Sequence, residues 1–129
     1  MGAPKILVVD DDTFVSYLMK TLLASDGYEI VTADNGDEAL EKIKQTHFDL
    51  VLTDWKMDGT DGMAVLAETK RLFPSLPVIL LTGHASYELK ERALDAGAQN
   101  CLAKPCRYEI LRSEIEKTLK LSRARCDPF

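Results

Sequence analysis

The sequence lacks long apolar runs, an export signal and paired cysteines. No apolar stretch approaches the roughly 18 residues that span a membrane, and residues 1–6 do not have the pattern of a signal peptide. The cysteines Cys101, Cys106 and Cys126 match no C-x-x-C or zinc-binding spacing. We therefore expect a cytoplasmic protein with reduced thiols and no membrane partner.

An excess of positive charge is absent as well. The formal net charge is -5 at pH 7, whereas proteins that bind nucleic-acid backbones usually carry a basic face. Direct nucleic-acid binding by this domain is therefore not expected. A local basic group near the end of the chain is explained by the preference of cations for the C-terminal end of a helix. Its members are Lys117, Lys120, Arg123 and Arg125.

Five short apolar runs alternate along the chain with five stretches of helical periodicity. The apolar runs, which we expect to be strands, are residues 6–9, 29–33, 50–53, 78–81 and 101–103. The first and last helical stretches are residues 14–24 and 108–121. In the first of them, Phe14, Leu18 and Leu22 recur at helical spacing.

This alternation predicts the fold class. Strands that are apolar on both faces and alternate with helices indicate a parallel sheet covered by helices on both sides. The expected fold is a five-stranded, doubly wound α/β sandwich of the flavodoxin-like (βα)5 kind, with strand order 2-1-3-4-5. We expect a single domain over residues 1–129, with a core of about 5–121 and a C-terminal tail or linker start over 122–129.

In such a sheet, functional groups gather where the parallel strands end. The polar residues there are Asp10, Asp11 and Asp12 after the first run, Asp54 after the third, Thr82 after the fourth and Lys104 after the fifth. Carboxylates, a hydroxyl and an ammonium should therefore converge at one edge. The first three acids can also be interpreted as caps of the first helix, and we assign only Asp12 to that role.

A cluster of this kind indicates two ligands, a cation and an anion. Neighbouring carboxylates repel one another, a divalent cation relieves the repulsion, and ligands that are all oxygen favour Mg²⁺. Lys104 and Thr82 make sense if an anion also binds, because a phosphoryl group offers oxygens to an ammonium, a hydroxyl and a metal. Asp54 ends the central strand, so it is the best placed nucleophile for an aspartyl phosphate.

Five motifs follow one another along the chain: Ile6–Asp11, Leu50–Met57, Asp61-Gly62, Leu80–Gly83 and Lys104-Pro105. Together they resemble the receiver domains of two-component response regulators, particularly the single-domain, chemotaxis-regulator-like type. They occur in the family's order and at family-like spacing. The resemblance implies a domain that accepts a phosphoryl group from a histidine kinase or a histidine phosphotransfer protein, depends on Mg²⁺, and switches conformation to control an output. Such a domain is a phosphoacceptor and not an enzyme in the sense of turnover.

The resemblance also implies the residues that bind the metal. Asp54 is the phosphoacceptor. Asp11 and Asp54 ligate Mg²⁺ together with the backbone carbonyl of Lys56, while Asp10 holds the metal largely through water.

Further residues are expected to bind the phosphoryl group and to control its lifetime. Thr82 hydrogen-bonds a phosphoryl oxygen in the active state, and Lys104 pairs with the phosphoryl group. Pro105 shapes the loop that follows, in this family usually through a cis peptide. Lys56 and His84 flank the phosphorylation site, at positions that tune hydrolysis of the acyl phosphate.

Two departures from the family pattern concern the output. Cys101 stands where the family usually has the aromatic residue that turns inward on activation, and Cys106 stands where Phe is common. Signal transfer through the face of the fourth helix, fifth strand and fifth helix is therefore open, and a homodimer through that face is one option.

Two other functions remain as alternatives. A receiver fold that acts as an interaction module without phosphorylation would explain the missing aromatic. A haloacid-dehalogenase-like phosphatase also places an Asp after its first strand, in the motif D-x-D-x-T/V. Phe14 fills the Thr/Val place of that motif, and 129 residues are few for that fold plus a cap.

Overall fold

The computed structural model describes residues 2–57, 59–83 and 86–126, which form strands and helices in strict alternation. The strands are β1 (Lys5–Val9), β2 (Glu29–Ala33), β3 (Leu50–Asp54), β4 (Val78–Thr82) and β5 (Asn100–Ala103). The helices are α1 (Thr13–Ser25), α2 (Gly36–Gln45), α3 (Gly62–Leu72), α4 (Tyr87–Asp95) and α5 (Tyr108–Cys126). Over these ranges, no helix has the length and apolarity needed to cross a bilayer.

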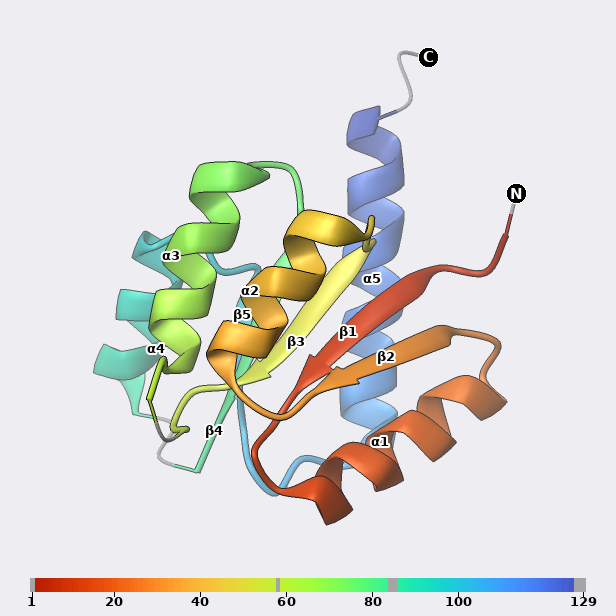
Figure 1. Ribbon diagram of the computed structural model, residues 1–129, viewed down its shortest axis with the longest axis horizontal. Coiled ribbons are helices and arrows are strands. Elements are labelled where there is room, and N and C mark those ends of the chain that lie inside the picture. The colour runs from red at the N-terminus through yellow and green to blue at the C-terminus, as the bar shows by residue number, and fades with distance from the viewer. Residues whose placement is uncertain (1, 58, 84–85, 127–129) are drawn as a thin grey trace.

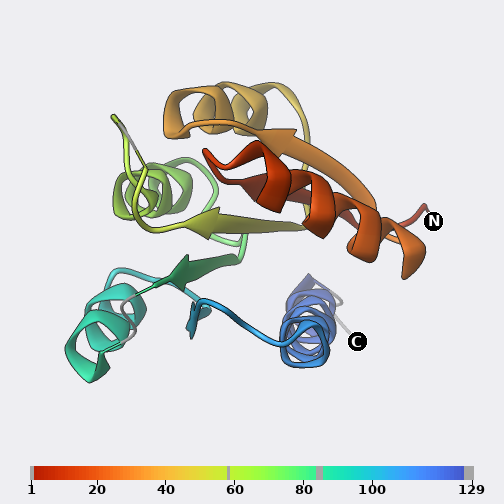
Figure 2. The ribbon, with the colours of Figure 1, turned by 90° about the horizontal axis from the view of Figure 1, so that it is seen from below.

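The strands form one parallel sheet in the order β2-β1-β3-β4-β5, which confirms the predicted fold. Helices α1 and α5 cover one face, and α2, α3 and α4 cover the other (Figures 1 and 2). Successive side chains of a strand point to opposite faces. Leu7 and Val9 therefore pack in the core on the α2–α4 side, whereas Ile6 and Val8 pack in the core on the α1–α5 side.

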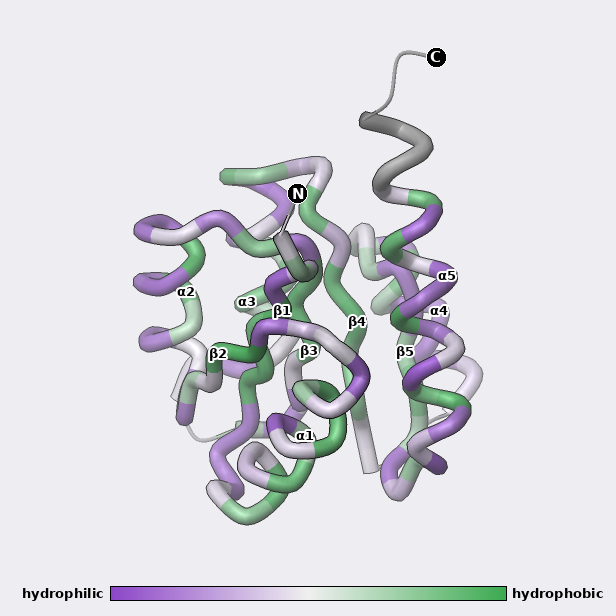
Figure 3. The backbone as a smooth tube through the Cα atoms, turned by 90° about the vertical axis from the view of Figure 1, so that its right-hand side faces the viewer, coloured by the Kyte–Doolittle hydropathy of each residue, from purple (hydrophilic) through white to green (hydrophobic). Residues whose placement is uncertain are grey.

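The colouring by hydropathy agrees with this layered arrangement. In Figure 3, β4 is hydrophobic over most of its length, whereas α5 alternates between hydrophobic and hydrophilic residues. The three central strands β1, β3 and β4 are buried on both faces, the edge strands β2 and β5 are only partly buried, and each helix is buried on one side. The sheet is therefore a rigid platform whose strand ends hold the functional side chains in place.

Side chains at the helix N-termini fix where four helices begin. Asp12, Asn35, Asp61 and Ser86 are the N-caps of α1, α2, α3 and α4, and each accepts a hydrogen bond from a backbone N–H of the first turn. Asp12 accepts from Phe14 at 3.0 Å. The capping role predicted for Asp12 is therefore confirmed.

The apolar residues that mark the periodicity of α1 are not the ones that it buries. Phe14 is 72% exposed and Leu18 is 46% exposed. The residues that α1 buries are Ser16, Met19 and Leu23. The helix was predicted correctly, but a second stripe packs against the sheet and leaves the first facing outward. Helix α5 also runs further than predicted, to Cys126.

Gly62 lies where the loop after β3 passes close to the end of that strand. A Cβ atom here would lie 2.3 Å from the Asp54 carbonyl oxygen and 2.9 Å from the Trp55 Cα. Because both are backbone atoms, we expect Gly62→Ala to lower the free energy of unfolding by about 1–3 kcal/mol. Urea unfolding measures the change. Gly83→Ala is the matched control, since its Cβ would meet nothing within 4 Å, and equal stability of the two variants would contradict this account.

Candidate functional site

The strand ends lie side by side at one edge of the sheet. The parallel register pairs Val9 with Thr53, Asp54 with Leu81, and Thr82 with Ala103. The polar residues at or just after these positions are therefore neighbours in space, as the sequence predicts. The predicted site residues that come together here are Asp10, Asp11, Asp54, Thr82 and Lys104.

Asp10, Asp11 and Asp54 form an acidic cluster in which one carboxylate oxygen of each lies within 4.8 Å of the others. Asp10 is buried, Asp54 is half-buried and Asp11 is exposed, so the cluster opens to solvent on the Asp11 side. A cavity of 340 Å³ adjoins it there. The residues that line this cavity are Asp11, Lys56, Met57, Gly59 and Asp61.

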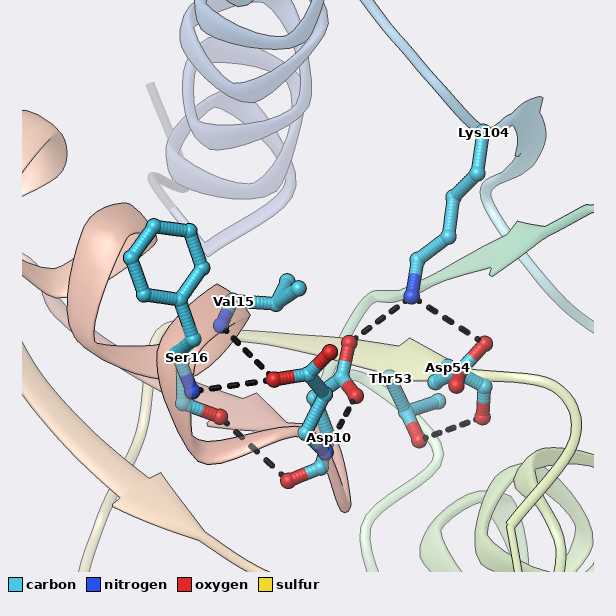
Figure 4. A network of polar contacts seen from close by, with 8 residues as sticks. Asp10, Val15, Ser16, Thr53, Asp54 and Lys104 are labelled. Atoms are coloured by element: carbon cyan, nitrogen blue, oxygen red, sulfur yellow. Dashed lines mark hydrogen bonds and ion pairs between the residues drawn. The ribbon is translucent and has the colours of Figure 1, made fainter.

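The Lys104 amine lies between two of these carboxylates (Figure 4). Its Nζ atom is 2.8 Å from Asp10 Oδ2 and 3.5 Å from Asp54 Oδ1. The closer partner is thus the buried Asp10 and not the expected phosphoacceptor. The Asp54 carboxylate therefore lies near a positive charge but is bound to it less closely than the Asp10 carboxylate is.

Backbone and side-chain hydrogen bonds hold Asp10 in place. Its N–H donates to the Ala33 carbonyl at 3.2 Å, and its Oδ1 accepts from the Asp12 N–H at 2.9 Å. Its carbonyl accepts a hydrogen bond from the Ser16 hydroxyl at 3.3 Å. Sequence reasoning missed Ser16, for which the only signal is a polar residue between the apolar positions of α1.

The end of β5 is joined to the end of β4. The Lys104 N–H donates to the Thr82 carbonyl at 2.7 Å, and Thr82 itself is buried. Pro105 follows Lys104 through a cis peptide bond, as expected. Lys56 is exposed at the rim of the cavity, and His84 lies outside the described residues.

Burial raises the pKa of Asp54 above its ordinary value, because the charged form loses contact with water. Lys104 opposes this rise, while the charges of Asp10 and Asp11 add to it. Burial alone would lower the pKa of Lys104, but its hydrogen bond with Asp10 and the charges of both acids outweigh burial and raise it. The amine is therefore an ammonium, and a bound cation would further stabilise the ionised form of Asp54.

The donor set fits a hard divalent cation. All three groups are carboxylates, and the single Lys104 ammonium leaves their combined charge negative. Mg²⁺ binds through one or two carboxylates and keeps several waters, and the exposed side of Asp11 leaves room for water. An ion such as zinc, which favours nitrogen and sulfur ligands, finds none in this cluster.

Cys101 and Cys106 lie apart from this chemistry. Cys101 is buried in the core on the α2–α4 side, and Cys106 is half-buried against the other core. Burial raises the pKa of both thiols, which keeps them protonated and slow to react. Both observations agree with the packing role predicted from the sequence.

The raised pKa of Asp54 predicts how stability depends on pH. Below the unfolded-state pKa, Asp54 is protonated in both the folded and the unfolded protein, and its burial does not lower the free energy of unfolding. As the pH rises through the higher folded-state pKa, the buried side chain becomes charged and this stability is lost. Without metal, Asp54→Asn should therefore raise the melting temperature at pH 7, with a smaller gain at pH 4.

Thermal unfolding followed by circular dichroism, in EDTA and then in Mg²⁺, measures this effect. Mg²⁺ should stabilise the wild type more than the variant, because ligand binding to the folded state adds to its stability. A variant less stable than the wild type at pH 7 in EDTA would show that the Lys104 contact outweighs the burial of Asp54.

Comparison with known proteins gives one consistent result. The model of the family described as response regulator receiver domain matches residues 6–116. The chain is 41% identical over 114 residues to the transcriptional regulatory protein ZraR of Escherichia coli K12, covering 88% of the chain and 26% of ZraR. It is 37% identical over 122 residues to the transcriptional regulatory protein GlrR of the same organism, covering 95% of the chain and 28% of GlrR.

Solved structures agree with the sequence comparisons. A CheY-like response regulator receiver domain protein from Methanospirillum hungatei superposes with a TM-score of 0.92 at 33% identity, covering 96% of this chain and 99% of that one. The response regulator protein TrrA from Thermotoga maritima, solved in complex with Mg(2+)-BeF, has a TM-score of 0.82 at 35% identity, covering 89% and 98%. The chain thus spans nearly all of these two proteins, but only about a quarter of ZraR and GlrR.

Proposed function

The chain belongs to the response regulator receiver domain family of two-component signalling, and on this basis we propose that Asp54 accepts a phosphoryl group. The donor is the phosphohistidine of a histidine kinase or of a histidine phosphotransfer protein. The observation that carries the proposal is the position of Asp54: a half-buried carboxylate at an accessible edge, 3.5 Å from the Lys104 ammonium and within 4.8 Å of two further acids.

The acidic cluster would hold Mg²⁺ through Asp10, Asp11 and Asp54, with the backbone carbonyl of Lys56 as the fourth protein group. When bound, the ion supplies positive charge that offsets the negative charge of the cluster and of the transferring phosphoryl group. The donor set supports this assignment because every group in it is an oxygen ligand. The TrrA complex with Mg(2+)-BeF supports it by similarity.

The transfer reaction needs a nucleophile and a nearby positive charge. An oxygen of the Asp54 carboxylate forms a bond to phosphorus while the bond from phosphorus to the donor's imidazole nitrogen breaks, and that nitrogen keeps the electron pair. The Lys104 ammonium pairs with the negative oxygens of the phosphoryl group, and its position beside Asp54 makes this stabilisation available without rearrangement. The domain is altered by the reaction and is not an enzyme in the sense of turnover.

The conformational switch follows from the new charge at Asp54. A phosphoryl group carries about -1.5 to -2 charges, and the hydroxyl of Thr82 can donate a hydrogen bond to one of its oxygens. The loop after β4, which begins beside Thr82, would then move between two conformations. Lys56 lies at the rim of the cavity beside Asp11, and from this position it would influence the water that hydrolyses the acyl phosphate.

Exposed apolar side chains next to the site offer a surface for the phosphodonor. Phe14, Tyr17 and Leu18 project from the first turns of α1, and Tyr17 is 70% exposed. Because α1 follows directly after Asp10 and Asp11, a partner that covers these residues would also cover the site. Large apolar groups grouped on a surface often mark an interface.

A charged residue on this surface should weaken the binding of the phosphodonor protein without changing the phosphoryl-transfer reaction at Asp54. With the kinase that phosphorylates the wild type fastest in a panel of purified histidine kinases, Tyr17→Asp should slow transfer by about tenfold or more. Its reaction with acetyl phosphate should not change, because a small donor needs no docking surface. Equal loss with both donors would mean that the substitution perturbs the site itself.

Intact-mass measurement after incubation with acetyl phosphate tests the proposed function directly. The wild type should gain the mass of one phosphoryl group in Mg²⁺ and none in EDTA, and fragmentation should place the group on Asp54. No gain in a folded protein that binds Mg²⁺ would overturn the proposal. That outcome would favour an interaction module that works without phosphorylation, which the small Cys101 at the position of the usual aromatic would suit.

A further inference from the structure

The first residue of α5 is bonded to the last turn of α1. The Tyr108 hydroxyl donates a hydrogen bond to the Leu22 carbonyl at 3.0 Å and also contacts the Asp26 carboxylate. Arg112, one turn further along α5, places its Nε atom 3.7 Å from Asp26 Oδ2. We call these three side chains, Asp26, Tyr108 and Arg112, the helix clamp.

The helix clamp adds a second donor at the C-terminal end of α1. Leu22 carries one of the last four carbonyls of α1, whose usual backbone donors lie beyond the end of the helix. Its oxygen accepts hydrogen bonds from the Ser25 hydroxyl at 2.7 Å and from the Tyr108 hydroxyl at 3.0 Å. Burial and the Asp26 carboxylate both raise the pKa of the Tyr108 hydroxyl, so it remains a proton donor. The tyrosine side chain also packs against the core on the α1–α5 side. The first turn of α5 is thus fixed in position by polar and apolar contacts together.

Tyr108 lies four residues after Lys104, with a short loop between them. On the sheet side, that loop is held by the hydrogen bond from the Lys104 N–H to the Thr82 carbonyl. On the helix side, it is held where Tyr108 meets α1. A segment fixed at both ends has few alternative conformations, so the Lys104 amine stays within reach of Asp10 and Asp54.

We propose that Tyr108 is a positioning residue, which acts through Lys104 by anchoring the loop after β5 to α1. The inference rests on the proposed phosphorylation of Asp54, in which the Lys104 ammonium stabilises the transferring group. Removing the hydroxyl while keeping the ring should loosen the loop and let the amine leave its place between the two acids. Misplacement of a catalytic group by fractions of an ångström lowers a rate several-fold.

Tyr108→Phe, which keeps the ring, tests the inference with two readouts. The rate of phosphorylation by acetyl phosphate in saturating Mg²⁺ should fall about fivefold. Independently of activity, Lys104 should react faster with formaldehyde and borohydride in metal-free protein, because its hydrogen bond with Asp10 now protects it less. Mass spectrometry of peptides measures that labelling relative to Lys20, an exposed lysine of α1.

Tyr87→Phe is the matched control, because Tyr87 is an exposed tyrosine at the start of α4, and it should change neither readout. Normal phosphorylation of Tyr108→Phe, or unchanged labelling of Lys104, would overturn the inference. A weaker affinity for Mg²⁺ in Tyr108→Phe would also overturn it, since the effect would then reach the acids and not the lysine alone. If the wild type itself takes up no phosphoryl group, the proposed function fails first, and the inference fails with it.

Discussion

Asp54→Asn should produce a folded protein that gains no phosphoryl mass from acetyl phosphate in Mg²⁺. The substitution keeps the shape of the side chain and replaces a carboxylate oxygen with an amide, which is a far weaker nucleophile. Asp10 is a poor substitute, because its two oxygens are already bonded to Lys104 and to the Asp12 N–H. We therefore expect a rate at least about 100-fold below that of the wild type, measured by intact mass over time.

The control for this experiment is Asp34→Asn. Asp34 directly follows β2 at the same edge of the sheet and is exposed, but it is not a member of the acidic cluster. It should be phosphorylated like the wild type. If Asp54→Asn took up the group at the wild-type rate, the acceptor would have to be another residue, and fragmentation would identify whether it is Asp11.

Lys104→Met should slow phosphorylation and strengthen Mg²⁺ binding at the same time. The substitution retains most of the side-chain length but removes the charge that stabilises the transferring group, and loss of one such group typically costs about 100-fold in rate. The same ammonium competes with a metal ion for Asp10 and Asp54, to which it is bound at 2.8 and 3.5 Å. Without the ammonium, the metal ion binds those two carboxylates with no competing positive charge.

Trp55 fluorescence is a suitable probe for the metal, because Trp55 follows Asp54 directly. Titration of Lys104→Met with Mg²⁺ should reach its midpoint at a lower concentration than titration of the wild type. Lys90→Met, at an exposed position on α4, should resemble the wild type in both rate and titration. A variant with a slow rate and weaker Mg²⁺ binding would point to a disturbed site and not to a missing charge.

The sheet covered on both sides and the convergence of the site could be predicted from the sequence for a simple reason. Apolar runs such as residues 50–53 are buried on both faces, so only a sheet covered on both sides accommodates them. Parallel strands end at a common edge, so the residues after β1, β3 and β5 had to meet there. Asp54 and Lys104 were found in this way, without knowledge of distances.

The sequence could not predict how the helices are oriented on the sheet or how side chains share their charges. Phe14 and Leu18 recur at helical spacing and predict the helix, but α1 is rotated so that Met19 and Leu23 face the sheet instead. The sequence contains two apolar stripes on α1, and nothing local decides between them. The bond from Tyr108 to Leu22 joins residues 86 positions apart, and only the assembled fold brings them together.

Several predictions made from the sequence are not tested by the structure of this domain. The homodimer through α4, β5 and α5, the absence of direct nucleic-acid binding and the influence of His84 on hydrolysis stay predictions. The division into a core of about residues 5–121 and a tail over 122–129 is likewise a proposal. Phosphorylated and unphosphorylated samples compared by sedimentation would address the dimer.

The contact between Lys104 and Asp10 joins residues 94 positions apart, and this separation has a consequence during synthesis on the ribosome. At about 5–20 residues per second, roughly 5–20 s pass between the incorporation of the acid and that of the amine that pairs with it. In that interval β1 and β3 can meet and bring their carboxylates together before the lysine exists. The nascent chain therefore passes through a stage in which the acids of the future site lack the Lys104 ammonium, and cations in solution can supply the missing counter-charge.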